Sequence, residues 1–364
     1  MRNPVRSSLA ASVLSLVGSL AACGAVAATP EPRAAPGLAV EVFASGLPSA
    51  REIALGAHGT VFVGSMAAGV VYAVTPHATG APQVRIVASG LQQPVGVAFH
   101  DGALFVSATR RIVVLRNIEA HLDAPPKPDT LIADLPWREG DHDWKFIAFG
   151  PDGRLYVPIG APCNICAIGH DYGKIMRFSA DGTHAESIAF GIRNSVGLAW
   201  DARGALWFTD NGRDWLGDDR PSDELNRLDH DGQEFGYPFC HQGDLADPQF
   251  GAGHPCSAFT PPVVKLGAHV AALGLRFDGD PAAPAALRGR VLIAEHGSWN
   301  RSTPSGYRVV AVDPATGAQT VLLDDRAADG TVLGRPADVQ PLPDGSVLIS
   351  DERRGVLLRL HAAP

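Results

Sequence analysis

The chain repeats one pattern of apolar and polar positions six times. Each copy has a short apolar stretch, a turn with glycine and a second stretch rich in β-branched and aromatic residues, as in residues 97–99, Gly102 and residues 104–106. The turn glycines are Gly59, Gly102, Gly153, Gly204, Gly289 and Gly345. Several short strands in units of about 40–50 residues are typical of propeller blades. The pattern therefore predicts an all-β fold, a six-bladed β-propeller.

Two departures from the repeat complete this prediction. Residues 39–43 form a β-rich stretch before the first copy, and we expect them to add a strand to the last blade and close the ring. The interval between Gly204 and Gly289 is the longest, and it holds an insertion at roughly residues 210–270, between the fourth and fifth repeats. Long insertions in compact folds are usually functional. A β-sandwich is the alternative fold, but six equivalent hairpins favour the propeller.

The N-terminal residues resemble a targeting segment. Arg2 and Arg6 precede an apolar run at residues 9–20, which is too short to span a bilayer and is typical of a secretory signal peptide. Residues 20–23, Leu-Ala-Ala-Cys, resemble the bacterial lipobox, whereas residues 25–27, Ala-Val-Ala, offer an ordinary cleavage site.

Of these two sites, we expect the lipobox to be used. Residues 1–22 would then be a lipoprotein signal peptide, Cys23 would carry the lipid, residues 23–37 would form a linker and residues 38–364 the propeller. This arrangement predicts a periplasmic protein that only its lipid chains hold to the bacterial envelope, at the outer membrane.

Four cysteines remain after Cys23, an even number for an oxidising compartment. Pairing with the nearest partner predicts two disulfides, Cys163–Cys166 and Cys240–Cys256. A zinc site with four thiolates is the alternative, because Cys163 and Cys166 have the spacing of zinc ligands. A second close pair of cysteines is missing, which favours the disulfides.

Composition narrows the classes of function. The chain has 38 acidic and 30 basic residues and a formal charge of −8, so it lacks the positive charge that binding to a nucleic-acid backbone requires. Its 46% hydrophobic and 19% charged residues are ordinary for a globular domain. No apolar stretch after residue 30 reaches the roughly 20 residues that span a bilayer. We therefore expect contact with a membrane only through the lipid anchor.

Polar residues gather in two loops that lead into strands. His142 lies between two aspartates in a loop with glycine, and a histidine in such a setting can act as a base near neutral pH. Arg193 and Asn194 stand between glycines just before a strand, where a guanidinium can bind carboxylates or quinone oxygens. Taken alone, these residues are also compatible with a surface loop and with an arginine that only binds loop carbonyls.

A third polar segment is rich in oxygen-bearing side chains. Residues 209–219 and 221–226 carry Asp, Asn, Thr, Ser and Glu, a composition that suits Ca²⁺, which takes six to eight oxygen ligands. The segment is not an EF-hand, because the glutamate at the twelfth loop position and the flanking helices are missing. A solvated acidic loop is the alternative.

The order of these segments resembles the soluble glucose and sorbosone dehydrogenases that depend on pyrroloquinoline quinone (PQQ). The resemblance covers about residues 38–360. Its most specific stretches are Gly191-Ile192-Arg193-Asn194, Trp207-Phe208-Thr209-Asp210-Asn211-Gly212-Arg213-Asp214, Asp223-Glu224-Leu225-Asn226 and Phe235-Gly236-Tyr237-Pro238, with residues 149–157 and 297–302 in addition. It implies a propeller with PQQ in a polar cleft over the central axis. The loop between Cys163 and Cys166 and the Asn300-Arg301 segment are closer to the sorbosone branch.

The resemblance implies a role for each matching residue near the cofactor. His142 matches the general base that takes the proton of the substrate hydroxyl while hydride moves to the quinone. Arg193 and Asn194 match the pair beside the quinone oxygens, where negative charge builds up during reduction. Arg335 stands where the family has arginines that pair with the carboxylates of the cofactor.

The resemblance also implies metal ligands. Gly212 and Arg213 match positions whose backbone carbonyls hold the Ca²⁺ that polarises the cofactor. Asp223 and Glu224 match an acidic pair that can bind a second, structural calcium ion.

Three positions depart from the glucose-oxidising members of that family. Asp143-Trp144-Lys145 follows the base in place of Asn-Gly-Gly, and Glu295-His296 stands where those members have a lysine that binds the cofactor. The arginine pair is reduced to Arg335. We include His296 among the cofactor contacts, and Lys145 and Arg301 are the candidates for restoring the missing positive charge.

Together these features predict an oxidoreductase that depends on PQQ and Ca²⁺. It would oxidise an aldose, or an aldehyde or alcohol derived from a sugar, with His142 as the base, and pass electrons to a periplasmic quinone or cytochrome. A lactone hydrolase with one divalent metal at the propeller axis is one alternative, and it would not need His142 or Arg193. A propeller without catalytic activity that binds ligands at the envelope is the other.

Overall fold

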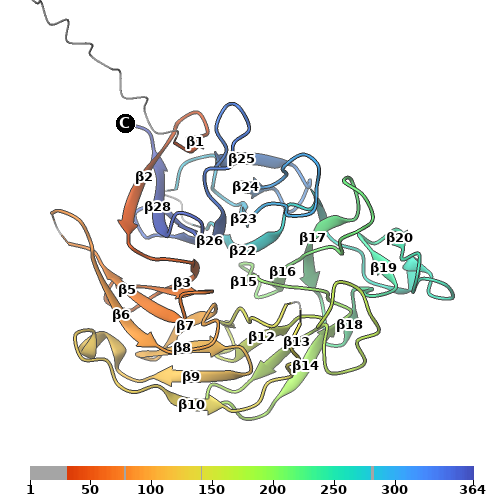
Figure 1. Ribbon diagram of the computed structural model, residues 1–364, viewed down its shortest axis with the longest axis horizontal. Coiled ribbons are helices and arrows are strands. Elements are labelled where there is room, and N and C mark those ends of the chain that lie inside the picture. Colours follow the sequence, from red (N-terminus) through yellow and green to blue (C-terminus); the bar gives the residue numbers. More distant parts are fainter. Residues whose placement is uncertain (1–30, 78, 141, 280–282) are drawn as a thin grey trace, which may run out of the picture. The chain divides into compact units, whose positions relative to one another are not determined.

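The computed structural model describes residues 31–77, 79–140, 142–279 and 283–364. The expected signal peptide, the lipobox and Cys23 lie outside these residues. The described part contains six sheets of four or five strands, arranged around a centre (Figure 1), and one small two-stranded sheet. The first strands of the six larger sheets line one central cavity. The prediction of an all-β, six-bladed propeller is therefore confirmed.

The strands follow the chain from blade to blade. Blades 1 and 2 consist of β3 (Ala50–Leu55), β4 (Val61–Ser65), β5 (Val70–Thr75) and β6 (Gln83–Ser89), then β7 (Val97–His100), β8 (Ala103–Ala108), β9 (Arg111–Leu115) and β10 (Asp129–Ile132). Blade 3 consists of β11 (Ala148–Phe149), β12 (Leu155–Ile159), β13 (Lys174–Phe178), β14 (Glu186–Phe190) and β18 (Gln233–Glu234). Blade 4 consists of β15 (Leu198–Trp200), β16 (Leu206–Asp210), β17 (Ser222–Leu228) and β21 (Val264–Ala268).

The last two blades contain the strands nearest the ends of the described chain. Blade 5 consists of β22 (Ala272–Phe277), β23 (Val291–Glu295), β24 (Arg308–Val312), β25 (Gln319–Asp324) and β1 (Arg33–Ala34). Blade 6 consists of β26 (Pro336–Pro341), β27 (Val347–Asp351), β28 (Val356–Ala362) and β2 (Leu38–Ser45). The pairing of β2 with β28 confirms the expected closure of the ring. Two residues of the expected linker form β1, so they belong to a blade.

The turn between the first and second strand of each blade needs glycine. The six glycines of the sequence repeat have φ between 68° and 82°, the left-handed region that L side chains rarely adopt. The same six positions therefore mark the inner hairpins in the sequence and allow them to close.

Apolar side chains hold neighbouring blades together. The buried residues fall into six hydrophobic clusters. Five of them join two adjacent blades, and the sixth joins blades 3 and 4 and also includes Leu273 of blade 5 and Ala337 of blade 6. Phe62 of blade 1 and Leu104 of blade 2, for example, share one cluster. Strand alternation places every second residue on a face between blades, so the core is a ring of contacts around the axis.

The insertion lies between the fourth and fifth glycine hairpins, as predicted, and it falls within blade 4. Its C-terminal part, β21, pairs with β17 as the fourth strand of that blade, and the intervening residues 229–263 include β18, β19 (Cys240–His241), β20 (Leu245–Ala246) and the short 3₁₀ helix η2 (Cys256–Ala258). Strand β18 pairs with β14 of blade 3. The outer strand β21 has no glycine hairpin of the repeated type, and for that reason the sequence pattern did not reveal it.

Both predicted disulfides, Cys163–Cys166 and Cys240–Cys256, are present. The only other helical element of the described residues is a second 3₁₀ turn, η1 (Ile118–His121). Within the described ranges, no helix has the length and apolar character needed to cross a membrane.

Candidate active site

Loops from five of the six blades surround a cleft of about 200 Å³. Its wall is formed where chain segments enter the first strand of blades 1, 3, 4, 5 and 6 and where they leave the second strand of blades 4 and 5. Seven of the predicted site residues meet in this cleft: His142, Arg193, Asn194, Gly212, Asp223, His296 and Arg335.

His142 is held as a neutral imidazole. Its Nδ1 donates to the carbonyl oxygen of Ala161 at 2.8 Å, because a carbonyl can only accept, and Nε2 is left as the basic atom. Burial lowers the pKa of His142 well below its ordinary value, and the charge of Arg193 lowers it further. Gly160 makes this position possible, since a Cβ there would lie 2.7 Å from the Cβ of His142.

Asp210, at the end of β16, fixes the Arg193–Asn194 loop. Its carboxylate accepts the backbone N–H groups of Arg193 and Asn194 at 2.9 and 2.6 Å. Burial raises the pKa of Asp210 to about 7. The guanidinium of Arg193 donates to the backbone and side-chain oxygens of Asn164 at 2.9 and 2.8 Å and lies 3.5 Å from Asp214. A side chain held on several sides is pre-organised for binding.

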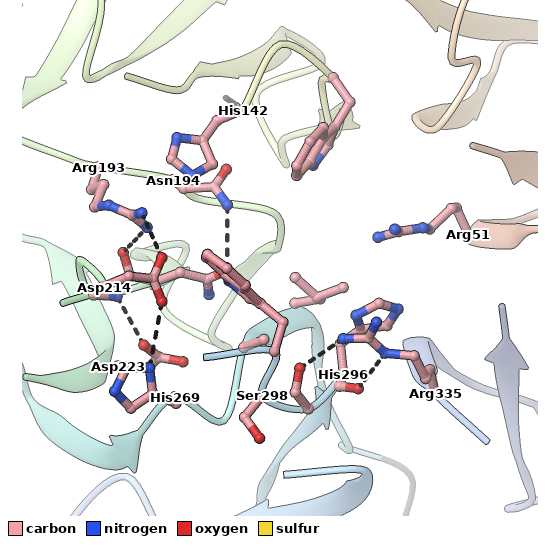
Figure 2. A pocket seen from close by; sticks show the side chains of 17 residues that line it. Arg51, His142, Arg193, Asn194, Asp214, Asp223, His269, His296, Ser298 and Arg335 are labelled. Atoms are coloured by element: carbon pink, nitrogen blue, oxygen red, sulfur yellow. Dashed lines mark hydrogen bonds and ion pairs between the residues drawn. The ribbon is translucent and has the colours of Figure 1, made fainter. Parts of the chain in front are cut away.

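Two arginines, Arg51 and Arg335, lie across the cleft from Arg193. Figure 2 shows Arg51, His296 and Arg335 on one side and His142, Arg193 and Asn194 on the other. Arg51 is the second residue of β3, the first strand of blade 1, and is only 7% exposed. The guanidinium of Arg335 donates to the carbonyls of His296 and Gly297 at 3.2 and 2.7 Å.

Glu352 links two residues of this wall, Arg51 and His296. It lies 3.0 Å from Nη2 of Arg51 and 2.7 Å from Nε2 of His296. Burial and the charge of Arg51 lower the pKa of His296 to about 3, so its ring is neutral. Nε of Arg51 is buried and has no hydrogen-bond partner. The charge of Arg51 is paired with Glu352, but a guanidinium N–H without a partner beside a cleft can donate to an anion.

The structure separates the predicted acidic pair. Asp223 and Glu224 are neighbours on β17, so their side chains point to opposite faces of the strand. Asp223 lines the cleft and accepts the backbone N–H of Gly212 at 2.8 Å. Glu224 faces a different, small cavity and accepts the N–H of Gln242 at 2.6 Å. The two carboxylates thus face different cavities, and a second calcium ion at this pair stays a prediction.

The other predicted metal positions differ in their surroundings. Gly212 lines the cleft, whereas the guanidinium of Arg213 pairs with buried Asp247 of the insertion at 2.6 Å. Over the described residues, no group of three or more His, Cys, Asp and Glu side chains is arranged to hold a metal. Calcium bound to the carbonyls of Gly212 and Arg213 stays a prediction.

Lys145 and Arg301, the candidates for the missing positive charge, do not line the cleft. Lys145 is 2% exposed, its Nζ donates to the carbonyl of Asp143 at 2.6 Å, and burial lowers its pKa to about 8. Arg301 pairs with Asp219 at 3.0 Å. Arg51 occupies the wall beside Arg335 instead. The sequence pattern missed Arg51 because it stands at the start of a strand and belongs to no polar cluster.

Residues 32–336 match a family model described as TrAA12-like. An uncharacterised protein of Borreliella burgdorferi is 29% identical over 343 residues, which cover 89% of each chain.

Solved structures share the fold over nearly their whole length. The iodide structure of a Trichoderma reesei enzyme of carbohydrate-active family AA12 is 21% identical, with a TM-score of 0.77 and coverage of 92% of this chain and 98% of that one. The holo PQQ domain of a Coprinopsis cinerea pyranose dehydrogenase is 19% identical, with a TM-score of 0.76 and coverage of 91% and 97%. The PQQ-bound aldose sugar dehydrogenase of Streptomyces coelicolor is 20% identical, with a TM-score of 0.66 and coverage of 92% and 100%.

At these identities, the structural similarity shows a common fold. The family model goes further, because its match runs from the residue before β1 to the first residue of β26. The chain therefore belongs to the TrAA12-like family.

Proposed function

We propose that the protein is a PQQ-dependent oxidoreductase that acts on a sugar or on an aldehyde or alcohol derived from one. The observation that carries this proposal is the pairing, in one cleft, of a neutral His142 with a cationic wall that has an unpaired donor. The similar structures support it, since one is named a pyranose dehydrogenase PQQ domain and another a PQQ-bound aldose sugar dehydrogenase.

The residues of the cleft fit an anionic quinone. PQQ is a tricarboxylate, and carboxylates prefer the two-pronged donors of arginine. Arg51 and Arg335 would hold its carboxylates, with the unpaired Nε of Arg51 as one donor. His296 would lie beside them as a neutral contact. Arg193 and Asn194 would face the quinone oxygens from the opposite wall.

A residue of the chain can accept the proton that the substrate hydroxyl loses in the reaction. When bound, the quinone would accept a hydride from the substrate carbon. Nε2 of His142 would take the hydroxyl proton, because Nδ1 is already committed to Ala161. The fixed charge of Arg193 would stabilise negative charge that develops beside it. A calcium ion at the carbonyls of Gly212 and Arg213 belongs to this proposal.

The finer expectations from the sequence also stay proposals. They are a sorbosone-like substrate, a periplasmic quinone or cytochrome as electron acceptor, and a lipid anchor at Cys23. A lactone hydrolase is less well supported, because the carboxylates near the axis already have partners. Asp338 accepts the N–H of Ile53 at 2.9 Å and pairs with Arg276 at 3.3 Å.

Calorimetric titration of the metal-stripped protein with PQQ, with and without Ca²⁺, tests the cofactor. We expect binding that calcium strengthens, followed by oxidation of aldoses in the presence of an electron-accepting dye. His142→Ala should still bind PQQ but lose turnover by roughly 10²–10⁴-fold, the usual contribution of a general base. His184→Ala, an exposed histidine of blade 3 outside the cleft, is the matched control. Absence of binding at micromolar PQQ would refute the proposal and leave the binding propeller.

A further inference from the structure

Two tryptophans are exposed at the mouth of the cleft. Among the described residues, six large hydrophobic side chains are exposed, and only Trp215 and Trp299 of these are aromatic, at 63% and 68%. Their ring centroids are 5.4 Å apart with planes at 88°, an edge-to-face pair. Exposure of an apolar indole ring to water is unfavourable, and an exposed apolar patch with a polar rim marks a binding surface.

The two indoles come from different blades and are held together by their loops. Trp215 follows β16 of blade 4, and Trp299 follows β23 of blade 5. Arg301 of the second loop pairs with Asp219 of the first at 3.0 Å, and Asp218 accepts the backbone N–H of Ser302 at 3.2 Å. The aromatic pair is therefore fixed by contacts between blades and does not depend on a single loop.

The backbone of Trp215 is in an uncommon conformation. Its φ is +69°, in the left-handed region that a bulky side chain rarely adopts. The neighbouring Asp214 lines the cleft and contacts both Arg193 and His269 at 3.5 Å. The strained residue thus turns its indole outward next to a side chain that faces the cleft. Such outliers persist where the surroundings hold them, often at ligand sites.

This aromatic pair continues the wall of the cleft. Trp299 itself lines the cleft together with Ser298. Asp214 and Ser298, the residues that precede the two tryptophans, are labelled on the cleft wall in Figure 2. A ligand that extends out of the cleft on this side would meet the indoles first.

We propose that Trp215 and Trp299 form a saccharide subsite, which binds the sugar ring next to the ring that is oxidised. The inference rests on the proposed function for the identity of the reacting ring. The C–H face of a pyranose is apolar and slightly positive, so it stacks on the negative face of an indole. Asp218, Asp219 and Arg301 surround the pair with groups that can bind hydroxyls. The favoured substrate is therefore an oligosaccharide or the end of a polysaccharide chain.

The size of the patch favours a sugar over a protein. The other four exposed large hydrophobics of the described chain, Val42, Ile86, Val263 and Val321, do not line the cleft. Stable protein interfaces bury about 800 Å² on each partner, which two indoles do not supply. The surface that two indoles offer is the size of one or two sugar rings.

Binding to the purified full chain without PQQ tests the subsite. Affinities for glucose, maltotriose and cellotriose are measured by calorimetry, with tryptophan fluorescence as a second signal. We expect at least one trimer to bind about tenfold or more tightly than glucose, and this advantage to disappear in Trp299→Ala and Trp215→Ala. The Trp→Phe variants should keep most of it. Trp137→Ala is the matched control, because Trp137 is half-buried, lies beside Arg110 and does not line the cleft.

The outcomes separate this inference from the proposed function. Equal affinities for glucose and both trimers, or a trimer affinity within twofold of wild type in both alanine variants, would overturn the subsite. Dimerisation that depends on Trp299 in sedimentation runs would also overturn it, in favour of contact between two copies. If PQQ fails to bind but the trimer advantage persists, the subsite stands and the oxidoreductase fails. If PQQ binds, Trp215→Ala, whose side chain does not line the cleft, should raise KM for trimers by a larger factor than it lowers kcat.

Discussion

Asn164 positions Arg193, and its removal tests how rigidly that arginine is held. Asn164 lies in the loop that the Cys163–Cys166 disulfide closes. Its side-chain oxygen accepts Nη2 of Arg193 and the backbone N–H of Asp214, both at 2.8 Å. Its backbone oxygen accepts Nε of Arg193 at 2.9 Å. Asn164→Ala removes the first two hydrogen bonds, together with a longer one from its side-chain N–H to the carbonyl of Asp214 at 3.3 Å, and leaves the bond to the backbone oxygen.

The size of the effect follows from those two bonds. A hydrogen bond to a charged group contributes about 1.5–3 kcal/mol and a neutral one about 0.5–1.5 kcal/mol. Asn164 is half-buried, so water can replace part of the loss. We therefore expect the low end of the sum, and Asn164→Ala should reduce the free energy of unfolding by about 2 kcal/mol. Arg193 would keep its bonds to the backbone oxygens of Asn164 and Asn211.

Urea unfolding measures this loss, and calorimetry measures its consequence for anion binding. Asn164→Asp is the control, because a carboxylate keeps an acceptor for both donors. It should recover more than half of the loss. A change below about 0.5 kcal/mol for the alanine variant would mean that Arg193 needs no support from this side chain. An aspartate variant as weak as the alanine variant would show that the oxygen is not the reason.

Three further predictions concern the cleft. Replacing Cys163 and Cys166 by Ser should weaken binding of PQQ through the freed loop, as calorimetry would show; unchanged affinity would separate the disulfide from the site. The imidazole of His142 should remain neutral at pH 6, with the proton on Nδ1 in ¹⁵N NMR, because burial lowers its pKa. Its folded pKa is below its unfolded pKa of about 6.5, so its stabilising contribution is full above that pH and is lost as pH falls towards the folded pKa; a charged ring at pH 6 would contradict this. Arg51→Leu should lower the affinity for PQQ about tenfold or more, whereas Arg51→Lys should restore part of it, and equal affinities in calorimetry would remove Arg51 from the site.

The blades could be predicted from the sequence because their hairpins are local. Alternation of side chains and a turn glycine determine each inner hairpin within one short stretch of the chain. The position of β21 in blade 4 depends on pairing with β17 across the insertion. Such non-local pairing leaves little trace in the local pattern.

The same reasoning separates the site residues that were found from those that were missed. Arg193 and Asn194 stand in a polar loop just before a strand, so a local pattern identified them. Arg51 reaches the cleft from the start of β3, and only the closed ring brings it close to Glu352 and Arg335. The charge of Lys145 suggested a contact with the cofactor, but a sequence does not tell in which direction a side chain points, and its Nζ donates to the carbonyl of Asp143.

The pairing of β2 with β28 has a consequence for how the molecule folds. Leu38 meets Ala362, so the last sheet requires residues from the beginning and the end of the described chain. Until β28 has been synthesised, β2 has no partner in that sheet and the ring cannot close. Contacts between such distant residues slow folding and expose strand edges meanwhile. Because the two ends meet in one sheet, a circular permutant with new ends in the loop between β6 and β7 would keep all six sheets and make blade 6 continuous in sequence.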